Sequence, residues 1–169
     1  MKLRKLNVKD IPGMMEWMQD VDISRQFRAD FSHYTEDKIK HFIDQAQDFT
    51  SHRHYAIVDE NDEYLGTISL KEIDTINMKA EYAIVLRRKV IGTSIASDAT
   101  HQILNIAFNE LMLNKVYLNV LAMNKRANRF YQKFGFVYEG TFRQDIKIEN
   151  ELYDLNWYSI LKESYESMD

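Results

Sequence analysis

The sequence predicts a mixed α/β domain, and three observations lead to this prediction. Segments with alternating apolar residues, typical of strands, are interleaved with segments whose apolar residues recur every three or four positions, typical of helices. A single proline and five glycines leave no Pro/Gly-rich linker that would divide the chain. The 169 residues, 45% hydrophobic and 28% charged, suit one globular core. We therefore expect a single domain over residues 1–169.

The first half of the chain predicts a strand, two helices and an antiparallel meander. Residues 2–8 alternate like a short strand, and Asp10 followed by Pro12 is typical of a helix start. Residues 20–34 lack a period, and a second helical pattern runs over residues 35–46. Three strands with short breaks follow, at residues 54–58, 64–72 and 78–86.

The second half predicts two helices and three strands. The apolar period changes from two to 3.6 over residues 95–111, which indicates a long helix. After a strand at residues 116–121, Asn124 begins a shorter helix that Gly135 ends in a position suited to a left-handed cap. The last two strands are expected at residues 136–148 and 151–161.

Composition excludes several kinds of function. A formal net charge of −4 and a pI near 5.7 argue against a general nucleic-acid binder. There is no cysteine, so a thiolate metal site and a cysteine nucleophile are excluded. The five histidines form no metal-site spacing apart from the loose pair His52 and His54. Without a signal-peptide pattern or an apolar run long enough for a membrane span, we expect a cytoplasmic protein that binds no membrane, nucleic acid or metal.

A basic loop joins the strand that ends at Leu86 to the long helix. Its sequence is Arg87-Arg88-Lys89-Val90-Ile91-Gly92-Thr93. A strand, a basic turn and a helix N-terminus bring N–H donors and a positive dipole to one place, where a pyrophosphate would fit. A solvated basic surface is the alternative interpretation.

The segment from Asn124 to Phe136 resembles a pattern of the GNAT superfamily of N-acetyltransferases. It follows the pattern N-x-x-A-x-x-x-Y-x-K-x-G-F, with Glu139-Gly140 behind it, and lies one strand after the basic loop. Leu3 to Leu6 is similar to the family's first strand, and Tyr64-Leu65-Gly66-Thr67-Ile68 to a later one. The ending Glu151 to Asp154 is similar to the branch of ribosomal-protein N-terminal, spermidine and amino-sugar acetyltransferases.

This resemblance implies both a fold and an activity. The implied fold is an α/β, GNAT-like mixed sheet, mostly antiparallel, with about seven strands, about four helices and a splay between the fourth and fifth strands. The implied activity is transfer of acetyl from acetyl-CoA directly to a primary amine in a ternary complex. A small-molecule or peptide amine is then the partner, and a homodimer stays open.

Site residues follow from the resemblance by position. Tyr131 stands where the family protonates the CoA sulfur, and Glu81 where many members hold a catalytic glutamate. The splayed strand would supply an N–H donor to the thioester carbonyl. The residues expected to bind the cofactor are Ile84, Val85, Leu86, Arg87, Arg88, Lys89, Val90, Ile91, Gly92, Thr93, Ser94, Asn124, Asn128 and Tyr131.

Five of these side chains also have a purely structural interpretation. Tyr131 can pack between helix and sheet, and Glu81 can simply face solvent. Asn124 can cap its helix, and Thr93 or Ser94 can cap the long helix. Sequence alone leaves both interpretations open.

Val90 departs from the family pattern Q/R-x-x-G-x-G/A, which has glycine at this place. A β-branched residue penalises unusual φ angles and close approach of a phosphate. This departure motivates an alternative function, a degenerate domain that binds CoA as a non-catalytic sensor or scaffold.

The acceptor also stays open among a protein N-terminus, a polyamine and an amino sugar linked to a nucleotide. Residues 26–31 and the hairpin around Asn150 are expected to line the acceptor cleft. A polyamine would favour the acidic residues Asp30, Glu149, Glu151 and Asp154, whereas a phosphate-bearing acceptor would favour Arg28 and Arg143.

Overall fold

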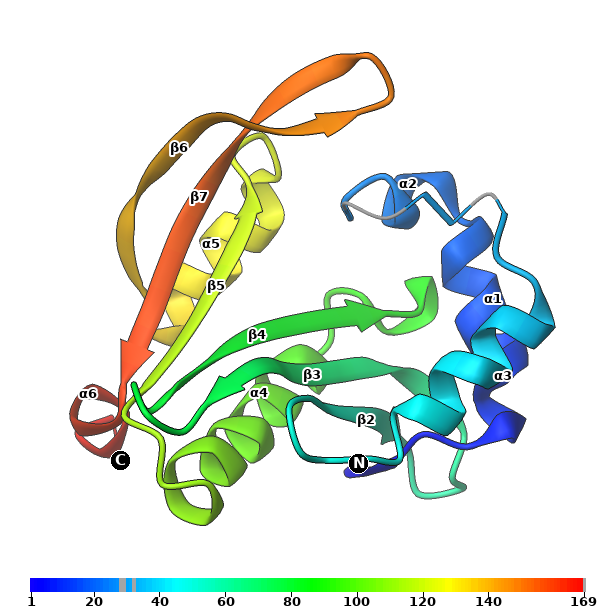
Figure 1. The fold of residues 1–169 in the computed structure, drawn as a ribbon, viewed down its shortest axis with the longest axis horizontal. Coiled ribbons are helices and arrows are strands. Elements are labelled where there is room, and N and C mark those ends of the chain that lie inside the picture. The colour runs from blue at the N-terminus through cyan, green and yellow to red at the C-terminus, as the bar shows by residue number, and fades with distance from the viewer. Residues whose placement is uncertain (28–29, 32, 169) are drawn as a thin grey trace.

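The computed structural model describes residues 1–27, 30–31 and 33–168, which form one sheet with helices on both of its faces (Figure 1). Within these residues the sheet has seven strands in the order β1-β2-β3-β4-β5-β7-β6. The strands are β1 (Lys2–Lys5), β2 (Arg53–Val58), β3 (Tyr64–Asp74), β4 (Lys79–Leu86), β5 (Lys115–Leu121), β6 (Val137–Ile148) and β7 (Glu151–Leu161). The α-helices are α1 (Ile11–Gln19), α2 (Val21–Ser24), α3 (Glu36–Gln45), α4 (Ile95–Asn105), α5 (Lys125–Phe134) and α6 (Lys162–Glu166).

The sheet divides at its centre, between β4 and β5. These two strands run parallel and pair only over Lys79–Glu81 and Lys115–Tyr117, whereas every other neighbouring pair is antiparallel. Beyond Glu81 the two strands diverge, β4 continuing beside β3 and β5 beside β7 (Figure 1). The expected fold class, including the splay between the fourth and fifth strands, is confirmed.

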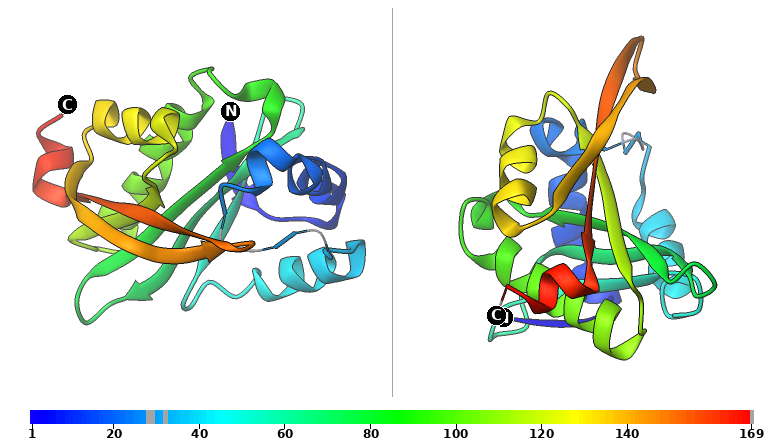
Figure 2. Two further views of the ribbon diagram at one scale, coloured as in Figure 1. Left: turned by 90° about the horizontal axis from the view of Figure 1, so that it is seen from above. Right: turned by 90° about the vertical axis from the view of Figure 1, so that its left-hand side faces the viewer.

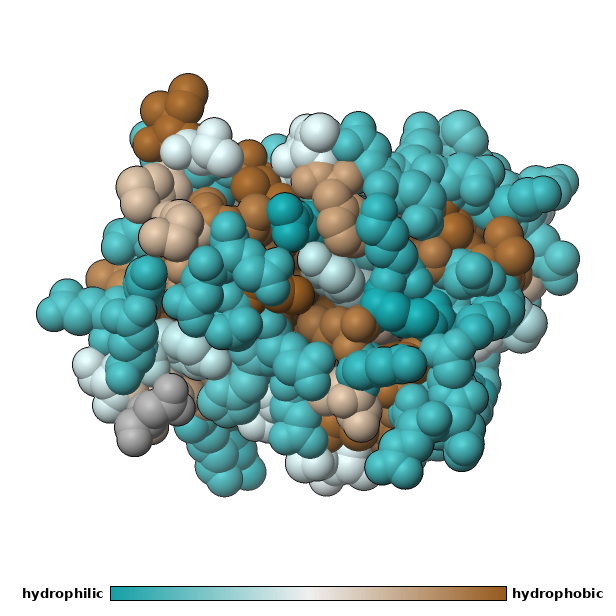
Figure 3. Space-filling model, turned by 90° about the horizontal axis from the view of Figure 1, so that it is seen from below, coloured by the Kyte–Doolittle hydropathy of each residue, from teal (hydrophilic) through white to brown (hydrophobic). Residues whose placement is uncertain are grey.

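Two apolar cores hold the layers together. The larger core lies between one face of the sheet and helices α4 and α5, with Phe108, Leu104 and Leu118 almost fully buried. The second core packs α1 and α3 against the opposite face of β2 to β4, around Met14 and Ile39. Each such side chain contributes about 1.5–3 kcal/mol relative to an exposed one. The outer surface is largely hydrophilic where Figure 3 shows it.

The β6–β7 hairpin projects on the same side of the sheet as α3, whereas α5 lies on the other side (Figure 2). The β5–β7–β6 half of the sheet is therefore covered by α5 on one face only. None of the described helices is long and apolar enough to cross a membrane.

Three local features differ from the sequence-based expectation. Residues 20–34 were expected to be irregular, but Val21–Ser24 form α2, which Asp20 caps by accepting from the Asp22 N–H. The expected long helix over residues 95–111 is α4 followed by a π-helical turn, Ile106–Glu110, in which the Leu111 N–H reaches Ile106 O at 2.9 Å. The short terminal helix α6 was missed. Helices of four or five residues are too short for a periodic apolar pattern to reveal them.

At two positions the backbone geometry requires glycine. Gly135 ends α5 with φ of 111°, the left-handed cap that the sequence predicts. At Gly66 in β3 a Cβ would lie 2.3 Å from Val85 O, so only glycine permits this approach of β3 to β4.

Candidate functional site

The gap between β4 and β5 exposes one edge of β4. The Arg87 N–H donates to Leu65 O at 2.8 Å, on the β3 side. Successive N–H groups of a strand point alternately to its two sides, and the β3–β4 register is regular from Gly66 to Lys71, opposite Leu86 to Glu81. The N–H of Val85 therefore faces β3, whereas those of Ile84 and Leu86 face the gap. Of the three residues expected to offer a donor there, two present an N–H to it.

Glu81 lies at the base of this gap. It is in register with Tyr117 at the last paired position of β4 and β5, and its side chain is 20% exposed. Its carboxylate accepts from Lys71 Nζ at 2.9 Å and from Asn119 Nδ2 at 3.5 Å. The carboxylate is therefore accessible at the gap and held on the face of the sheet away from α5.

Tyr131 covers the same place from the opposite face. Its ring lies 5.9 Å from the Tyr82 ring of β4 and 6.2 Å from the Tyr158 ring of β7, the strands on either side of β5. The side chain is 8% exposed, and its hydroxyl has no hydrogen-bond partner within the described residues. Burial raises the pKa of Tyr131 above its usual value of 10. The phenol therefore keeps its proton at neutral pH and can act as an acid.

Glu81 and Tyr131 thus approach the gap from opposite faces, with the free N–H groups of Ile84 and Leu86 between them. A carboxylate can take a proton from an attacking nucleophile, N–H groups can stabilise an oxyanion, and a phenol can protonate a leaving group. The arrangement suits acyl transfer through the sheet.

The cations of the basic loop already have acidic partners. Arg88 Nε donates to Asp20 at 2.6 Å and Arg88 Nη2 to Asp22 at 3.0 Å, and the first contact lowers the pKa of Asp20. The pairs in the described residues are Arg87 with Glu16 and Glu63, Arg88 with Asp20 and Asp22, and Lys89 with Glu63. The bridges to Glu16, Asp20 and Asp22 join the loop to α1 and α2, and those to Glu63 join it to the turn between β2 and β3. A phosphate would have to compete with these carboxylates for the cations of the loop.

Val90 is unstrained in this loop. It closes the 3-10 turn Arg88–Val90, donates its N–H to Arg87 O at 3.1 Å and packs against the larger core, and its φ is outside the left-handed region. Ile91 packs against the second core. Gly92 has φ of +89° with open space around it, so the glycine that the conformation needs is Gly92.

The hydroxyls after Gly92 act within the loop. Thr93 Oγ1 donates to Val90 O at 2.7 Å and accepts from the Ile95 N–H at 3.3 Å, while Ser94 Oγ donates to Asp98 at 2.9 Å. Thr93 thus accepts one N–H at the start of α4, whereas Ser94, at the N-cap position, makes no side-chain cap hydrogen bond. The N-terminus of α4 still leaves its first N–H groups without helical acceptors, which suits an anion.

The two asparagines of α5 have structural partners. Asn124 Oδ1 accepts from the Ala127 N–H at 3.1 Å and so caps the helix. Asn128 Nδ2 donates to Leu121 O and Asn124 O at 3.0 and 2.8 Å, and its Oδ1 accepts from Asn156 and Tyr158, each at 2.8 Å. All four hydrogen-bonding positions of the Asn128 amide are occupied. Asn128 ties α5 to the ends of β5 and β7, close to Tyr131.

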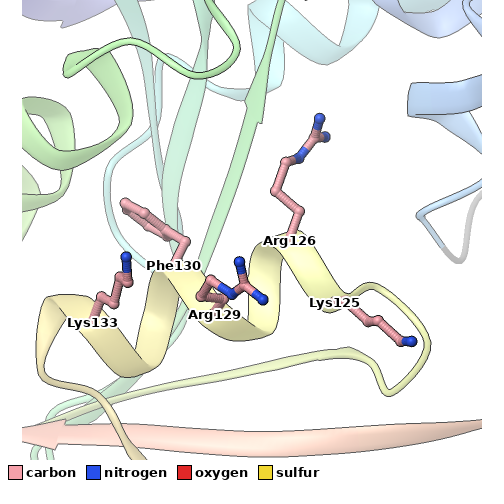
Figure 4. Close-up of a pocket in the computed structure, with 5 residues that line it drawn as sticks. All are labelled: Lys125, Arg126, Arg129, Phe130 and Lys133. Carbon is pink, nitrogen blue, oxygen red and sulfur yellow. The ribbon is translucent and has the colours of Figure 1, made fainter.

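A basic hollow on α5 escaped the sequence-based prediction. It has a volume of about 400 Å³, and its lining is Lys125, Arg126, Arg129, Phe130 and Lys133. Arg126, Arg129, Phe130 and Lys133 project from one side of α5, whereas Lys125 extends away from them (Figure 4). No salt bridge involves these cations within the described residues. The sequence feature that could have predicted it is the presence of four basic residues and no acidic residue in one helix.

Most of the residues proposed to line the acceptor cleft lie in the β6–β7 hairpin. Asp154 accepts from the Gln144 N–H at 2.8 Å, and Glu151 accepts from the Tyr153 hydroxyl at 2.7 Å. Glu149 and Asn150 form the hairpin turn, Arg143 lies on exposed β6, and Asp30 precedes α3. Arg28 lies outside the described residues. Glu151 is eight residues from Ser159, which pairs with Tyr117, so the tip is roughly 26 Å along β7 from the base of the gap.

The described residues contain no group of three His, Asp or Glu side chains arranged to hold a metal ion. His52 and His54 are stacked with ring centroids 6.0 Å apart. Burial, with smaller effects from His52 and Lys71, lowers the pKa of His54 to about 4.

Comparison with known proteins identifies relatives along the whole chain. The sequence model of the acetyltransferase (GNAT) domain matches residues 1–137. The chain is 27% identical over 166 residues to the uncharacterized N-acetyltransferase p20 of Bacillus licheniformis, covering 96% of this chain and 93% of that protein. It is 29% identical over 126 residues to a spermidine N(1)-acetyltransferase of Vibrio cholerae, covering 75% and 70% of the two chains.

A similar fold occurs in the crystal structure of spermidine N-acetyltransferase from Vibrio cholerae in complex with CoA and spermine. The TM-score is 0.89 at 24% identity, with 98% of this chain and 97% of that chain covered. At this identity the likeness shows the fold alone.

Proposed function

Because the chain belongs to the family of GNAT acetyltransferase domains and is an acetyl-CoA-dependent N-acetyltransferase, we propose that it acetylates a primary amine of a polyamine such as spermidine in a ternary complex. The observation that carries the proposal is the gap between β4 and β5, with Glu81 on one face and Tyr131 on the other. Without cysteine the chain has no thiol for an acyl-enzyme.

In this proposal the amine approaches from the Glu81 face and the CoA sulfur leaves toward Tyr131. The thioester carbonyl accepts from an edge N–H of Ile84 or Leu86 as its oxygen becomes negative. A primary amine with a pKa near 10.4 is neutral in fewer than about one molecule per thousand at pH 7, so Glu81 has a proton to remove. The pantetheine arm occupies the gap.

The nucleotide end of CoA is then expected across the N-terminus of α4 and the basic hollow of α5. The hollow offers unpaired cations at Arg126, Arg129 and Lys133, with the Phe130 ring between them. CoA carries phosphates and an adenine ring, which need such groups. Asn124 and Asn128 shape this wall through the cap of α5 and its link to β7.

A polyamine is favoured over the other acceptors by the charges around the open face. The pKa of Tyr117 is raised mainly by burial and, to a smaller extent, by the negative charges of Glu81, Glu72 and Asp74. These three carboxylates stand near two ammonium groups, Lys71 and Lys79, which leaves a net negative charge where a cationic amine would approach. The spermidine N-acetyltransferase among the relatives agrees with this choice. The alternative of a non-catalytic sensor rested on strain at Val90, and Val90 is unstrained.

The test is initial-rate measurement of free CoA with acetyl-CoA and a panel of amines: spermidine, a peptide with a free N-terminus and a UDP-linked amino sugar. We expect the highest kcat/KM with spermidine. Double-reciprocal plots of rate against one substrate, drawn at several concentrations of the other, should give lines that meet at one point. Parallel lines would contradict the ternary complex. A preference for the peptide or amino sugar would contradict the acceptor, and CoA binding without turnover on any amine would contradict catalysis.

A further inference from the structure

Three aromatic side chains form a strip on the face of the β5–β7–β6 half of the sheet that lies opposite α5: Tyr117, Trp157 and Phe142. Tyr117 and Trp157 lie at diagonal positions of β5 and β7, since Tyr117 pairs with Ser159 and Asn119 with Trp157. Phe142 lies on β6, opposite Leu155. Residues in register share a face, so the strip lies on the same face as Glu81, which is in register with Tyr117.

The rings of the strip follow one another away from Glu81. The Tyr117 and Trp157 ring centroids are 6.2 Å apart with the planes 25° from parallel, and those of Trp157 and Phe142 are 5.1 Å apart. The spacing between rings is comparable with that between ammonium groups separated by three or four methylenes. Phe142 is 54% exposed. The Trp157 Nε1 atom is buried without a hydrogen-bond partner, so the indole N–H is closed to a ligand.

One primary ammonium of the chain already lies at the Tyr117 end of this strip. Lys79 Nζ lies 5.8 Å from the centroid of the Tyr117 ring, within the range of a cation–π contact. The charges of Glu81, Glu72 and Asp74 act on Tyr117 and raise its pKa after the larger effect of burial. An ammonium near Tyr117 is therefore attracted by both the ring and the carboxylates.

We propose that the strip Tyr117–Trp157–Phe142 binds the non-reacting, positively charged part of the amine acceptor while its reacting amine lies at Glu81. This inference rests on the proposed function and specifies how that site selects its substrate. The strip selects a linear alkylamine with more than one ammonium group, because a series of ring faces offers repeated cation sites and methylene contacts.

The inference can be tested with Phe142→Ala and Trp157→Leu, together with Trp157→Phe as the conservative variant. The matched control is Leu152→Ala in the same hairpin. Leu152 is also 54% exposed, and its place in β7 directs it to the opposite face from Trp157. KM and kcat are measured for spermidine and for butylamine, and the affinity for CoA is measured separately.

We expect Phe142→Ala and Trp157→Leu each to raise KM for spermidine about tenfold, with kcat and CoA affinity within twofold of the unchanged protein. The effect on butylamine should be under threefold, Trp157→Phe should restore most of the spermidine affinity, and Leu152→Ala should change nothing. An unchanged KM for spermidine in both variants would overturn the inference while leaving the acetyltransferase function intact.

A binding measurement separates failure of the strip from failure of the proposed function. In a Trp17→Phe background Trp157 is the only tryptophan. Titration with spermidine in the presence of CoA should then change Trp157 emission, and the change should saturate with the KM of turnover. Absence of any emission change would overturn the inference whether or not acetyl transfer occurs.

Discussion

Replacing Tyr131 with phenylalanine removes one oxygen atom and isolates its chemical role. The ring contacts with Tyr82, Phe136 and Tyr158, at 5.9, 5.7 and 6.2 Å, remain available to a phenylalanine. Burial alone shifts the pKa of Tyr131, without a contribution from a hydrogen bond to its hydroxyl, so removal of the hydroxyl leaves no partner unpaired. We expect the free energy of unfolding to change by less than about 1 kcal/mol and Tm by under about 3 °C.

The effect on catalysis should be much larger. If Tyr131 protonates the departing sulfur, its loss should lower kcat at least tenfold, a barrier increase of at least about 1.4 kcal/mol. The assay follows free thiol at saturating acetyl-CoA and amine, with the CoA dissociation constant measured by calorimetry. A kcat unchanged in a variant that folds and binds CoA normally would refute the acid role. It would leave Tyr131 as a packing residue.

Three further predictions follow from other contacts. Burial lowers the pKa of His54 from 6.5 to about 4, so His54 is neutral in the folded protein. The free energy of unfolding is therefore at its full value above pH 6.5 and falls by up to about 3 kcal/mol between pH 6.5 and 4. Urea unfolding of His54→Gln should show a shallower pH dependence, and an identical dependence would contradict this. The double variant Arg126→Gln, Arg129→Gln should weaken CoA binding about tenfold at low salt and weaken the binding of dephospho-CoA by less, with Lys40→Gln as the exposed control. Binding is measured by calorimetry, and equal losses of affinity for both ligands would place the 3′-phosphate elsewhere. Asn128→Leu should lower kcat more than CoA affinity, because its amide positions α5 and the sulfur side of the gap; a loss confined to CoA affinity would instead indicate a direct ligand.

The sequence predicted those features that depend on local pattern. The strands, the Asn124 cap and the Gly135 cap each follow from neighbouring residues, and the structure has all of them. The splay was expected only from the family resemblance. It depends on where β5 changes partner from β4 to β7, which is a long-range choice that no local period records.

The partners of the charged residues could not be predicted for the same reason. Arg87 and Arg88 were expected at a phosphate, yet they meet Glu16 and Asp20 from a helical layer about 70 residues earlier in the chain. The strip of Tyr117, Trp157 and Phe142 comes from three strands whose register is set by bulges in β6. Asn128 was expected to bind the cofactor, whereas the structure uses its whole amide between α5, β5 and β7.

Following a labelled acetyl group shows directly whether the protein acetylates spermidine. The protein is incubated with acetyl-CoA carrying ¹³C in the acetyl group and with spermidine, and the products are quantified by mass spectrometry. We expect one labelled acetyl group on a primary amine of spermidine for each CoA released. Release of CoA with labelled acetate and unmodified spermidine would contradict it.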